Sequence, residues 1–182
     1  MNFLDKHFGR LGNRMFQTAF FYSYAKENGI DYYFQNPKWF EKYATDIQKL
    51  FGEGIGYEDK VSIHIRRNDY VGNPFYVDLW KSGYFQKAIA MFPDDKFLVF
   101  SDDNEWVFQQ FEGAKFEFAV GNEEEDLKRM ASCKHNIIAN SSYSYWAAWL
   151  NPNPDKIVVA PKAWYSDGDN SRTILPTNWI RI

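Results

Sequence analysis

The sequence is poor in cysteine and has no long hydrophobic run. Cys133 is the only cysteine among 182 residues, so an intrachain disulfide is excluded, and so is a structural zinc site built from the cysteines of one chain. Such cysteine usage fits a reducing compartment. The apolar stretch 15–24 is interrupted by Gln17, Thr18 and Ser23 and falls short of the roughly 18 apolar residues that span a bilayer.

The sequence also has no excess of positive charge. The chain has 21 Lys and Arg against 24 Asp and Glu, which gives a net charge of -3. Without a broad basic field, sequence-independent binding of nucleic acid is excluded. Residues 1–6 lack the charged and apolar regions of a secretory signal. We therefore expect a soluble, cytoplasmic protein with no membrane span and no nucleic-acid partner.

Aromatic side chains, in contrast, are abundant. The 17 Phe, 12 Tyr and 7 Trp make up 20% of the chain, and hydrophobic residues in total make up 45%. This composition is typical of a globular protein and excludes a disordered or collagen-like chain. Aromatic rings bury a large apolar area, so a chain of this length can build a dense core. That core fits one ordinary domain or two small lobes that share a site.

Short β-rich runs alternate with helical patterns in the second part of the chain. Strands are predicted at residues 61–66, 96–100, 115–118, 135–139 and 156–160, and helices at 82–92, 104–111, 123–132 and 142–150. Such alternation indicates a parallel sheet with helices on both faces. The predicted fold class is therefore α/β and Rossmann-like.

The first sixty residues are less regular. Asn13 is expected to cap a helix over residues 13–28. Residues 31–34 are a candidate strand, and an Asn-Pro pair is a typical start for a helix over 36–51. Residues 52–56, GEGIG, predict a flexible turn that separates two lobes.

Polar side chains follow the predicted strands at the edge where open parallel sheets bind ligands, outside the carboxyl ends of the strands. These ends carry Arg66-Arg67-Asn68-Asp69, Ser101-Asp102-Asp103 and Asn140-Ser141-Ser142, the last of which begins a predicted helix. We therefore expect two arginines, several carboxylates and a serine-rich helix start to meet at one edge of the sheet.

This edge has the chemistry of a phosphate site. Ser141, Ser142 and the backbone N–H groups that follow offer an anion site at a helix N-terminus. Arg66 or Arg67 adds a fixed charge with bidentate reach to phosphate oxygens. In the alternative interpretation, the arginines form only ion pairs with nearby aspartates, and the serines only cap the helix. The placement of both features at adjacent strand ends favours phosphate binding.

His64 shares a strand face with Arg66, so a ligand contact is one interpretation of it and a packed core histidine is the other. His7 and His135 lie far away in the sequence, and no spacing typical of metal ligands is visible. The side chains of the adjacent Asp102-Asp103 pair diverge if the backbone is extended. A mechanism without a metal is therefore predicted.

Four blocks of sequence resemble glycosyltransferase family 11, the α-1,2-fucosyltransferases that use GDP-fucose. The blocks are residues 9–17 (GRLGNRMFQ), 64–70 (HIRRNDY), 100–106 with FSDD and Trp106, and 133–165 with CKHNIIANSSYS. They stand in the order of the family and cover most of residues 59–165. Without the resemblance, the first block is as well explained by a simple turn before a helix.

The resemblance implies a GT-B-like pair of Rossmann-like lobes and metal-independent, inverting transfer of L-fucose to a sugar hydroxyl. It also implies roles for particular residues. By the resemblance, Arg66 contacts the β-phosphate, and Arg67 supports the structure or the acceptor side. His64 lies by the nucleoside, and Asp126 accepts from guanine N–H groups. The diphosphate is held by Ser141, Ser142 and Tyr143, and Gly12 and Asn13 close over it. Asp69 is the candidate general base and Asp102 a further substrate contact, and the identity of the base stays open.

The chain also departs from the family pattern. It has Asn68 in place of the usual Gly, Arg14 in place of Gln, and Tyr145-Trp146-Ala147 in place of Trp-Trp-Gly. The segment 18–63 between the first two blocks is much shorter than in the family. We therefore predict a shortened N-terminal, acceptor-side lobe over residues 1–58 and a nucleotide-sugar-binding lobe over residues 59–182.

The expected partners are a nucleotide sugar and a glycan acceptor, with no cofactor. Three alternatives stay open at this point. The chain could be a catalytically silent protein of this family that binds GDP-sugars or glycans. It could also be a homo-oligomer in which a partner's aromatic surface replaces the missing part of the first lobe. A different guanosine-diphospho-sugar donor is the third alternative.

Overall fold

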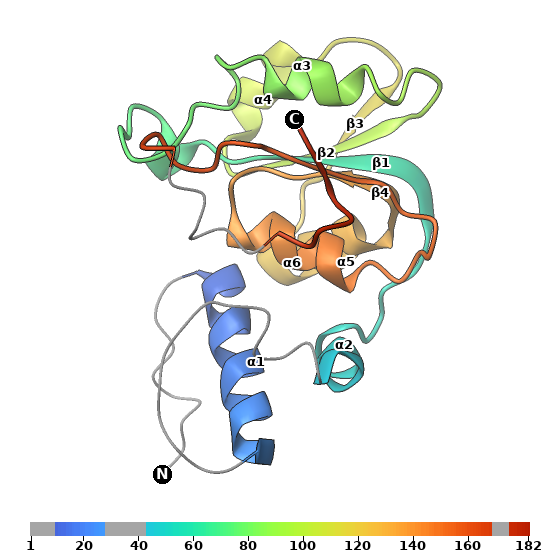
Figure 1. Ribbon diagram of the computed structural model, residues 1–182. Coiled ribbons are helices and arrows are strands. Elements are labelled where there is room, and N and C mark those ends of the chain that lie inside the picture. The colour runs from blue at the N-terminus through green and yellow to red at the C-terminus, as the bar shows by residue number, and fades with distance from the viewer. Residues whose placement is uncertain (1–9, 28–42, 169–174) are drawn as a thin grey trace.

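The computed structural model describes residues 10–27, 43–168 and 175–182, and these form one parallel sheet wrapped by helices (Figure 1). The strand order is β3-β2-β1-β4-β5-β6, and every strand pair is parallel. The strands are β1 (Glu58–Ile65), β2 (Phe97–Ser101), β3 (Phe116–Phe118), β4 (Cys133–Ile137), β5 (Val158–Ala160) and β6 (Ile180–Arg181). This is the strand order of the Rossmann fold, so the predicted α/β class is confirmed.

The strand order reverses between β1 and β4. From β1 the chain proceeds outward to β2 and β3, and from β4 it proceeds in the other direction to β5 and β6. The pairing of Ile63 with Ile137 brings the carboxyl ends of these two strands together. Such a reversal leaves a crevice at the carboxyl ends, because the loops that follow the two strands turn to opposite faces of the sheet.

Helices cover both faces of the sheet, as predicted. Figure 1 shows α3 (Tyr84–Ile89) and α4 (Asn104–Gln110) on one face, and α5 (Glu123–Ser132) and α6 (Ser142–Leu150) on the other. The side chains of each strand therefore divide between two hydrophobic clusters, because successive residues point to opposite faces. Strands β2 and β5 are nearly continuous apolar runs, as expected of strands buried on both faces, whereas β1 was recognisable from its alternation of β-branched and polar residues.

The N-terminal part of the chain packs on the α6 side. Helix α1 (Leu11–Glu27) lies against α6, and Phe16 places its ring 5.0 Å from Tyr145 and 4.8 Å from Trp146, centroid to centroid. Both of these α6 rings are fully buried. Burying a large apolar side chain contributes about 1.5–3 kcal/mol, so these aromatic contacts attach α1 to the body of the protein.

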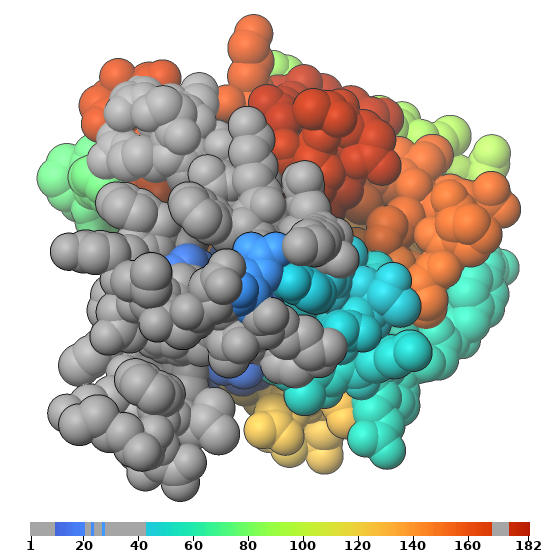
Figure 2. Space-filling view, turned by 60° about the horizontal axis from the view of Figure 1, so that its bottom comes forward, coloured from blue at the N-terminus to red at the C-terminus, as the bar shows by residue number. Residues whose placement is uncertain are grey.

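Helix α2 (Ala44–Phe51) lies beside the end of α1 (Figure 2). The hydroxyl of Tyr43, just before α2, donates a hydrogen bond to the carboxylate of Glu27 at 3.2 Å. Ile47 of α2 is completely buried in the cluster that α1, α5 and α6 share. Two helices of this part of the chain are thus described, and a strongly reduced N-terminal lobe stays a prediction.

Several expectations for the N-terminal part are corrected or lie outside the described residues. Asn13 is not the helix cap, because α1 begins at Leu11 and the amide of Arg14 already donates to the carbonyl of Arg10 at 3.1 Å. The candidate strand at 31–34 and the predicted start of the second helix are outside the described ranges. The division at residue 58 stays a prediction.

Two further points concern strand β6 and the lengths of the described helices. The two-residue strand β6 had no predicted counterpart, because so short a run carries no periodicity. No helix within the described ranges is long and apolar enough to cross a membrane.

Candidate active site

A cleft of about 630 Å³ opens at the carboxyl ends of β1, β2 and β4, where the strand order reverses. It is bordered by the start of α1 on one side and by the start of α6 on another. Ten of the eleven residues that the sequence nominates line it, namely Gly12, Asn13, His64, Arg66, Asp69, Asp102, Asp126, Ser141, Ser142 and Tyr143. The exception is Arg67.

The N-terminus of α6 contributes its backbone N–H groups to the cleft. Ser141 leaves the end of β4 in an extended conformation, and its hydroxyl accepts a hydrogen bond from the amide of Tyr143 at 3.3 Å. Its carbonyl accepts the first helical hydrogen bond, from the amide of Tyr145 at 3.0 Å. The positive dipole end of the helix favours an anion at this point of the cleft.

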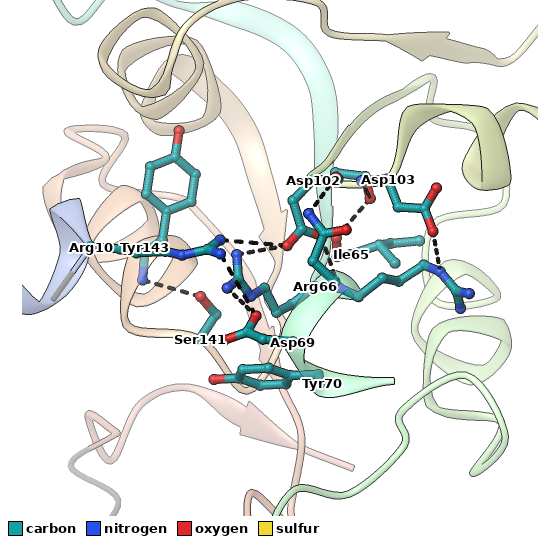
Figure 3. Close-up of polar contacts among 12 residues, drawn as sticks. Arg10, Ile65, Arg66, Asp69, Tyr70, Asp102, Asp103, Ser141 and Tyr143 are labelled. Atoms are coloured by element: carbon teal, nitrogen blue, oxygen red, sulfur yellow. Dashed lines mark hydrogen bonds and ion pairs between the residues drawn. The ribbon is translucent and has the colours of Figure 1, made fainter. Parts of the chain in front are cut away.

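Arg66 leaves the end of β1 and lies between two carboxylates (Figure 3). Its Nη1 atom is 2.7 Å from Oδ2 of Asp102, and its Nη2 atom donates to Oδ1 of Asp69. The ion pairs proposed as the alternative to phosphate binding are therefore present. They use two of the five N–H donors of the guanidinium, which leaves further donors available to a ligand.

Two stacked tyrosine rings lie beside Arg66. The guanidinium carbon lies 5.3 Å from the ring centroid of Tyr70, and this ring stacks on Tyr76 at 3.8 Å with an angle of 5° between the planes. The Tyr70 hydroxyl donates to the carbonyl of Asn140 at 3.1 Å. Tyr70, Tyr76 and Asn140 line the cleft but are not among the predicted site residues, although two of them directly adjoin predicted positions.

Arg67 points away from the cleft. Its Nε atom donates to Oδ2 of Asp103 at 2.9 Å, and its guanidinium lies 3.6 Å from the ring centroid of Trp106. Its backbone amide donates to Oδ1 of Asp102 at 2.8 Å, which fixes the carboxylate that Arg66 contacts. Consecutive residues at a strand end point to opposite sides, so the second arginine holds the loop while the first reaches the cleft.

His64 is a neutral, buried side chain at the floor of the cleft. Burial, together with the nearby charge of Arg66, lowers its pKa from 6.5 to about 3. The imidazole is 5.4 Å from the ring of Tyr143, centroid to centroid, and its Nδ1 atom has no hydrogen-bond partner within the described residues. A neutral imidazole with one unused nitrogen can donate or accept one hydrogen bond from a ligand.

The far end of the cleft is acidic. Asp126 lies in the first turn of α5, and burial raises the pKa of its carboxyl group, against a smaller opposing effect of the Gly121 backbone. Its Oδ1 atom is buried and accepts no well-formed hydrogen bond from the described residues. Nearby, the Tyr143 hydroxyl donates to the carbonyl of Glu123 at 2.6 Å. This end therefore offers carboxylate oxygens to a ligand with N–H groups.

Gly12 and Asn13 join the start of α1 to the start of α6. A Cβ atom on Gly12 would lie 2.5 Å from the amide nitrogen of Tyr143, so only glycine permits this approach. The hydroxyl of Ser142 donates to the side-chain oxygen of Asn13 at 2.8 Å. Both residues stand at the wall of the cleft, as the resemblance implies, and their contact with a diphosphate stays a prediction.

Arg10, at the very start of α1, also lines the cleft and is not among the predicted site residues. Within the described part of the chain, no group of three or more His, Cys, Asp or Glu side chains is arranged to hold a metal ion. Metal independence is not tested by this observation and stays a prediction.

The fold and the cleft define a Rossmann-like protein whose strand-end crevice suits a phosphorylated ligand. The chain belongs to glycosyl transferase family 11, whose family model matches residues 4–182. Comparison with solved structures finds no significant match.

Relatives of the chain carry transferase names. The chain is 39% identical over 133 residues to the O-antigen biosynthesis glycosyltransferase WbnK of Escherichia coli, an alignment that covers 66% of the chain and 44% of the relative. It is 32% identical over 178 residues to an alpha-1,2-colitosyltransferase of Escherichia coli, covering 82% of the chain and 61% of the relative. The galactoside 2-alpha-L-fucosyltransferase Sec1 of Mus musculus is 29% identical over 105 residues, 50% of the chain and 28% of the relative.

Proposed function

We propose that the protein transfers L-fucose from GDP-fucose to a sugar hydroxyl, as a galactoside α-1,2-fucosyltransferase does, with inversion and without a metal ion. The family and the names of its relatives support glycosyl transfer as the reaction class. The matched part of each of these relatives is between 28% and 61% of its length, so the activity is proposed for the chain rather than carried over.

The observation that carries this proposal is the position of Arg66 opposite the α6 N-terminus, in one cleft with Ser141 and Ser142. When the bond between the sugar and the diphosphate breaks, negative charge develops on the β-phosphate oxygen of the departing GDP. A guanidinium and helix N–H groups that are already in place stabilise this charge without reorganisation. The sugar then passes through an oxocarbenium-like state, as in other glycosyl transfers.

The acceptor hydroxyl must lose its proton as its oxygen attacks the anomeric carbon. Asp69 is the proposed base, because its carboxylate lines the cleft beside Arg66 and is 59% exposed. In the balanced step, the acceptor oxygen forms the new glycosidic bond, its proton moves to the carboxylate, and GDP leaves with the electron pair of the broken bond. A positioned base contributes about 10²–10⁴-fold to such a step.

The proposed nucleoside end is the acidic end of the cleft. Guanine presents N–H groups at one edge, and the buried carboxylate oxygen of Asp126 is a matching acceptor. The unused nitrogen of His64 provides a second hydrogen-bonding position between this end and the diphosphate. Adenine and uracil nucleotides lack this pair of donors, so this arrangement predicts a preference for guanosine diphosphate.

Calorimetric titration of the chain with GDP, ADP and UDP tests the donor side. We expect GDP to bind and the other two to bind at least tenfold more weakly, whereas Asp126→Asn abolishes the preference. Arg14→Ala is a matched control, because Arg14 is exposed on the same helix turn as the cleft residues but does not line the cleft. Absence of GDP binding at millimolar concentration would refute the proposal.

Transfer to galactoside acceptors tests the chemistry. With GDP-fucose as donor, we expect product that is lost in Arg66→Ala, that is reduced 10²-fold or more in Asp69→Asn, and that persists in EDTA. A donor panel that adds a colitosyl nucleotide and GDP-mannose separates the sugars. GDP binding without any transfer or donor hydrolysis would instead identify a catalytically silent binding protein.

A further inference from the structure

Two arginines from distant parts of the chain contact the same two carboxylates (Figure 3). Arg66 follows β1 and pairs with Oδ2 of Asp102 at 2.7 Å and with Oδ1 of Asp69. Arg10 directly precedes α1, and its guanidinium nitrogens lie 3.7 Å from the same oxygen of Asp102 and 4.0 Å from the same oxygen of Asp69. The four side chains form one cluster of two positive and two negative charges.

The two arginines are not equivalent. The side chain of Arg66 is 11% exposed and lies over the ring of Tyr70, whereas that of Arg10 is 56% exposed and approaches the carboxylates from the open side. The contacts of Arg66 are the shorter ones. Arg10 is therefore a second cation beside both carboxylates, at ion-pair distance but beyond the length of a hydrogen bond.

The charge balance of this cluster decides whether an anion can use Arg66. With both arginines present, the four charges cancel. Without Arg10, a single guanidinium faces Asp69 and Asp102, and the cluster has a net charge of -1 beside the α6 N-terminus. A diphosphate would then have to approach two incompletely neutralised carboxylates, and like charges in close proximity oppose binding.

We propose that Arg10 is a positioning residue that takes over Asp69 and Asp102 when a diphosphate binds to Arg66. The inference rests on the proposed function, because it assigns the exchange to the donor diphosphate. Arg66 turns some of its donors from the carboxylates to phosphate oxygens, and Arg10 closes on the carboxylates that are released. Arg10 thereby keeps Arg66 available without itself touching the phosphate.

A double-mutant cycle on GDP affinity tests this exchange. We expect Arg10→Ala to weaken GDP binding about tenfold and Asp102→Asn alone to strengthen it several-fold. In the double variant Arg10→Ala/Asp102→Asn, the cluster is neutral again and GDP affinity returns to within about threefold of wild type. Binding of unmodified guanosine should be unchanged in all three variants. Arg14→Ala is the control for loss of one positive charge on α1.

The outcomes separate this inference from the proposed function. If the wild-type chain does not bind GDP, the proposed function and the inference are both wrong. If the wild type binds GDP but Arg10→Ala binds equally well, only the inference is overturned. If Arg10→Ala is weaker and the double variant is not rescued, Arg10 contacts the phosphate directly and the exchange is also overturned.

A second cycle covers the case in which Asp102→Asn does not fold, since Asp102 also accepts from the Arg67 amide. Asp69→Asn removes the other, exposed carboxylate. In the double variant Arg10→Ala/Asp69→Asn, GDP affinity should again return to within about threefold of wild type, and failure of this rescue would overturn the exchange. Thermal unfolding of every variant confirms that affinities are compared between folded proteins.

Discussion

Replacement of Gly12 by alanine tests the close contact between α1 and α6. The added Cβ would lie 2.5 Å from the amide nitrogen of Tyr143, 2.6 Å from the carbonyl carbon of Ser142 and 2.8 Å from its hydroxyl. Two of these atoms are backbone atoms that cannot rotate away, so the helix starts must separate. Such overpacking costs about 1–3 kcal/mol. For a chain of this size, each kcal/mol lowers Tm by about 2–4 °C.

The matched control is Gly56→Ala. A Cβ there meets only the hydroxyl of Ser132, at 4.0 Å, and the backbone is not in the left-handed region. We expect Gly56→Ala to leave Tm unchanged or to raise it slightly, because it restricts the unfolded chain. Thermal unfolding followed by circular dichroism measures both variants. A Gly12→Ala protein with the Tm of the wild type or of Gly56→Ala would refute the reasoning.

Three further predictions concern individual side chains. Burial holds the pKa of His64 at about 3, so the unfolded chain binds a proton below pH 6.5 that the folded chain does not. The free energy of unfolding should therefore fall by about 1.4 kcal/mol between pH 7.5 and 5.5 in urea titrations, and His64→Gln should remove this component. Ser141→Ala should cost about 1 kcal/mol of stability by loss of the cap. Ser141→Asp should instead retain the cap, keep Tm and weaken GDP binding in calorimetry through charge repulsion. Arg67→Lys should weaken the cation–π contact with Trp106 and cost about 1 kcal/mol in urea unfolding, with GDP affinity within about twofold of wild type.

A specific result would contradict each of these predictions. Equal pH slopes in the wild type and the His64 variant would mean that the histidine is solvated. Undiminished GDP binding in Ser141→Asp would place the anion away from the start of α6. A large loss of GDP affinity in Arg67→Lys would give the second arginine a role at the cleft that its contacts with Asp103 and Trp106 do not support.

Much of the sheet and its ligand edge follows from local sequence. Apolar runs marked β2 and β5, and alternating β-branched residues marked β1. The polar residues that end parallel strands must share an edge of the sheet. The helices at 123–132 and 142–150 match α5 and α6 residue for residue, because an acidic first turn marks the start of α5 and a serine cap marks the start of α6. The strand order could not be predicted, since it depends on pairings such as β1 with β4 between segments distant in sequence.

The contents of the site were harder to anticipate than its position. Arg66 was recognisable from its place after a strand, but its simultaneous contact with Asp69 and Asp102 depends on side-chain geometry. The stacking of Tyr70 on Tyr76 joins residues six apart in an irregular loop, where no periodicity applies. The role of Gly12 rests on a contact with α6, more than a hundred residues away, that composition and spacing do not encode.

One turn of helix connects these observations. Arg10 directly precedes α1, and Gly12 and Asn13 lie in its first turn. Arg10 contacts the carboxylates, Gly12 the α6 backbone and Asn13 the Ser142 hydroxyl. A displacement of this turn therefore changes packing and charge balance together. Gly12→Ala should lower both Tm and GDP affinity, whereas Arg10→Ala, at an exposed side chain, should lower GDP affinity alone. Tm and GDP affinity should therefore fall together in Gly12→Ala, but GDP affinity alone should fall in Arg10→Ala. This difference distinguishes the packing of α1 against α6 from the charge that Arg10 contributes to the cleft.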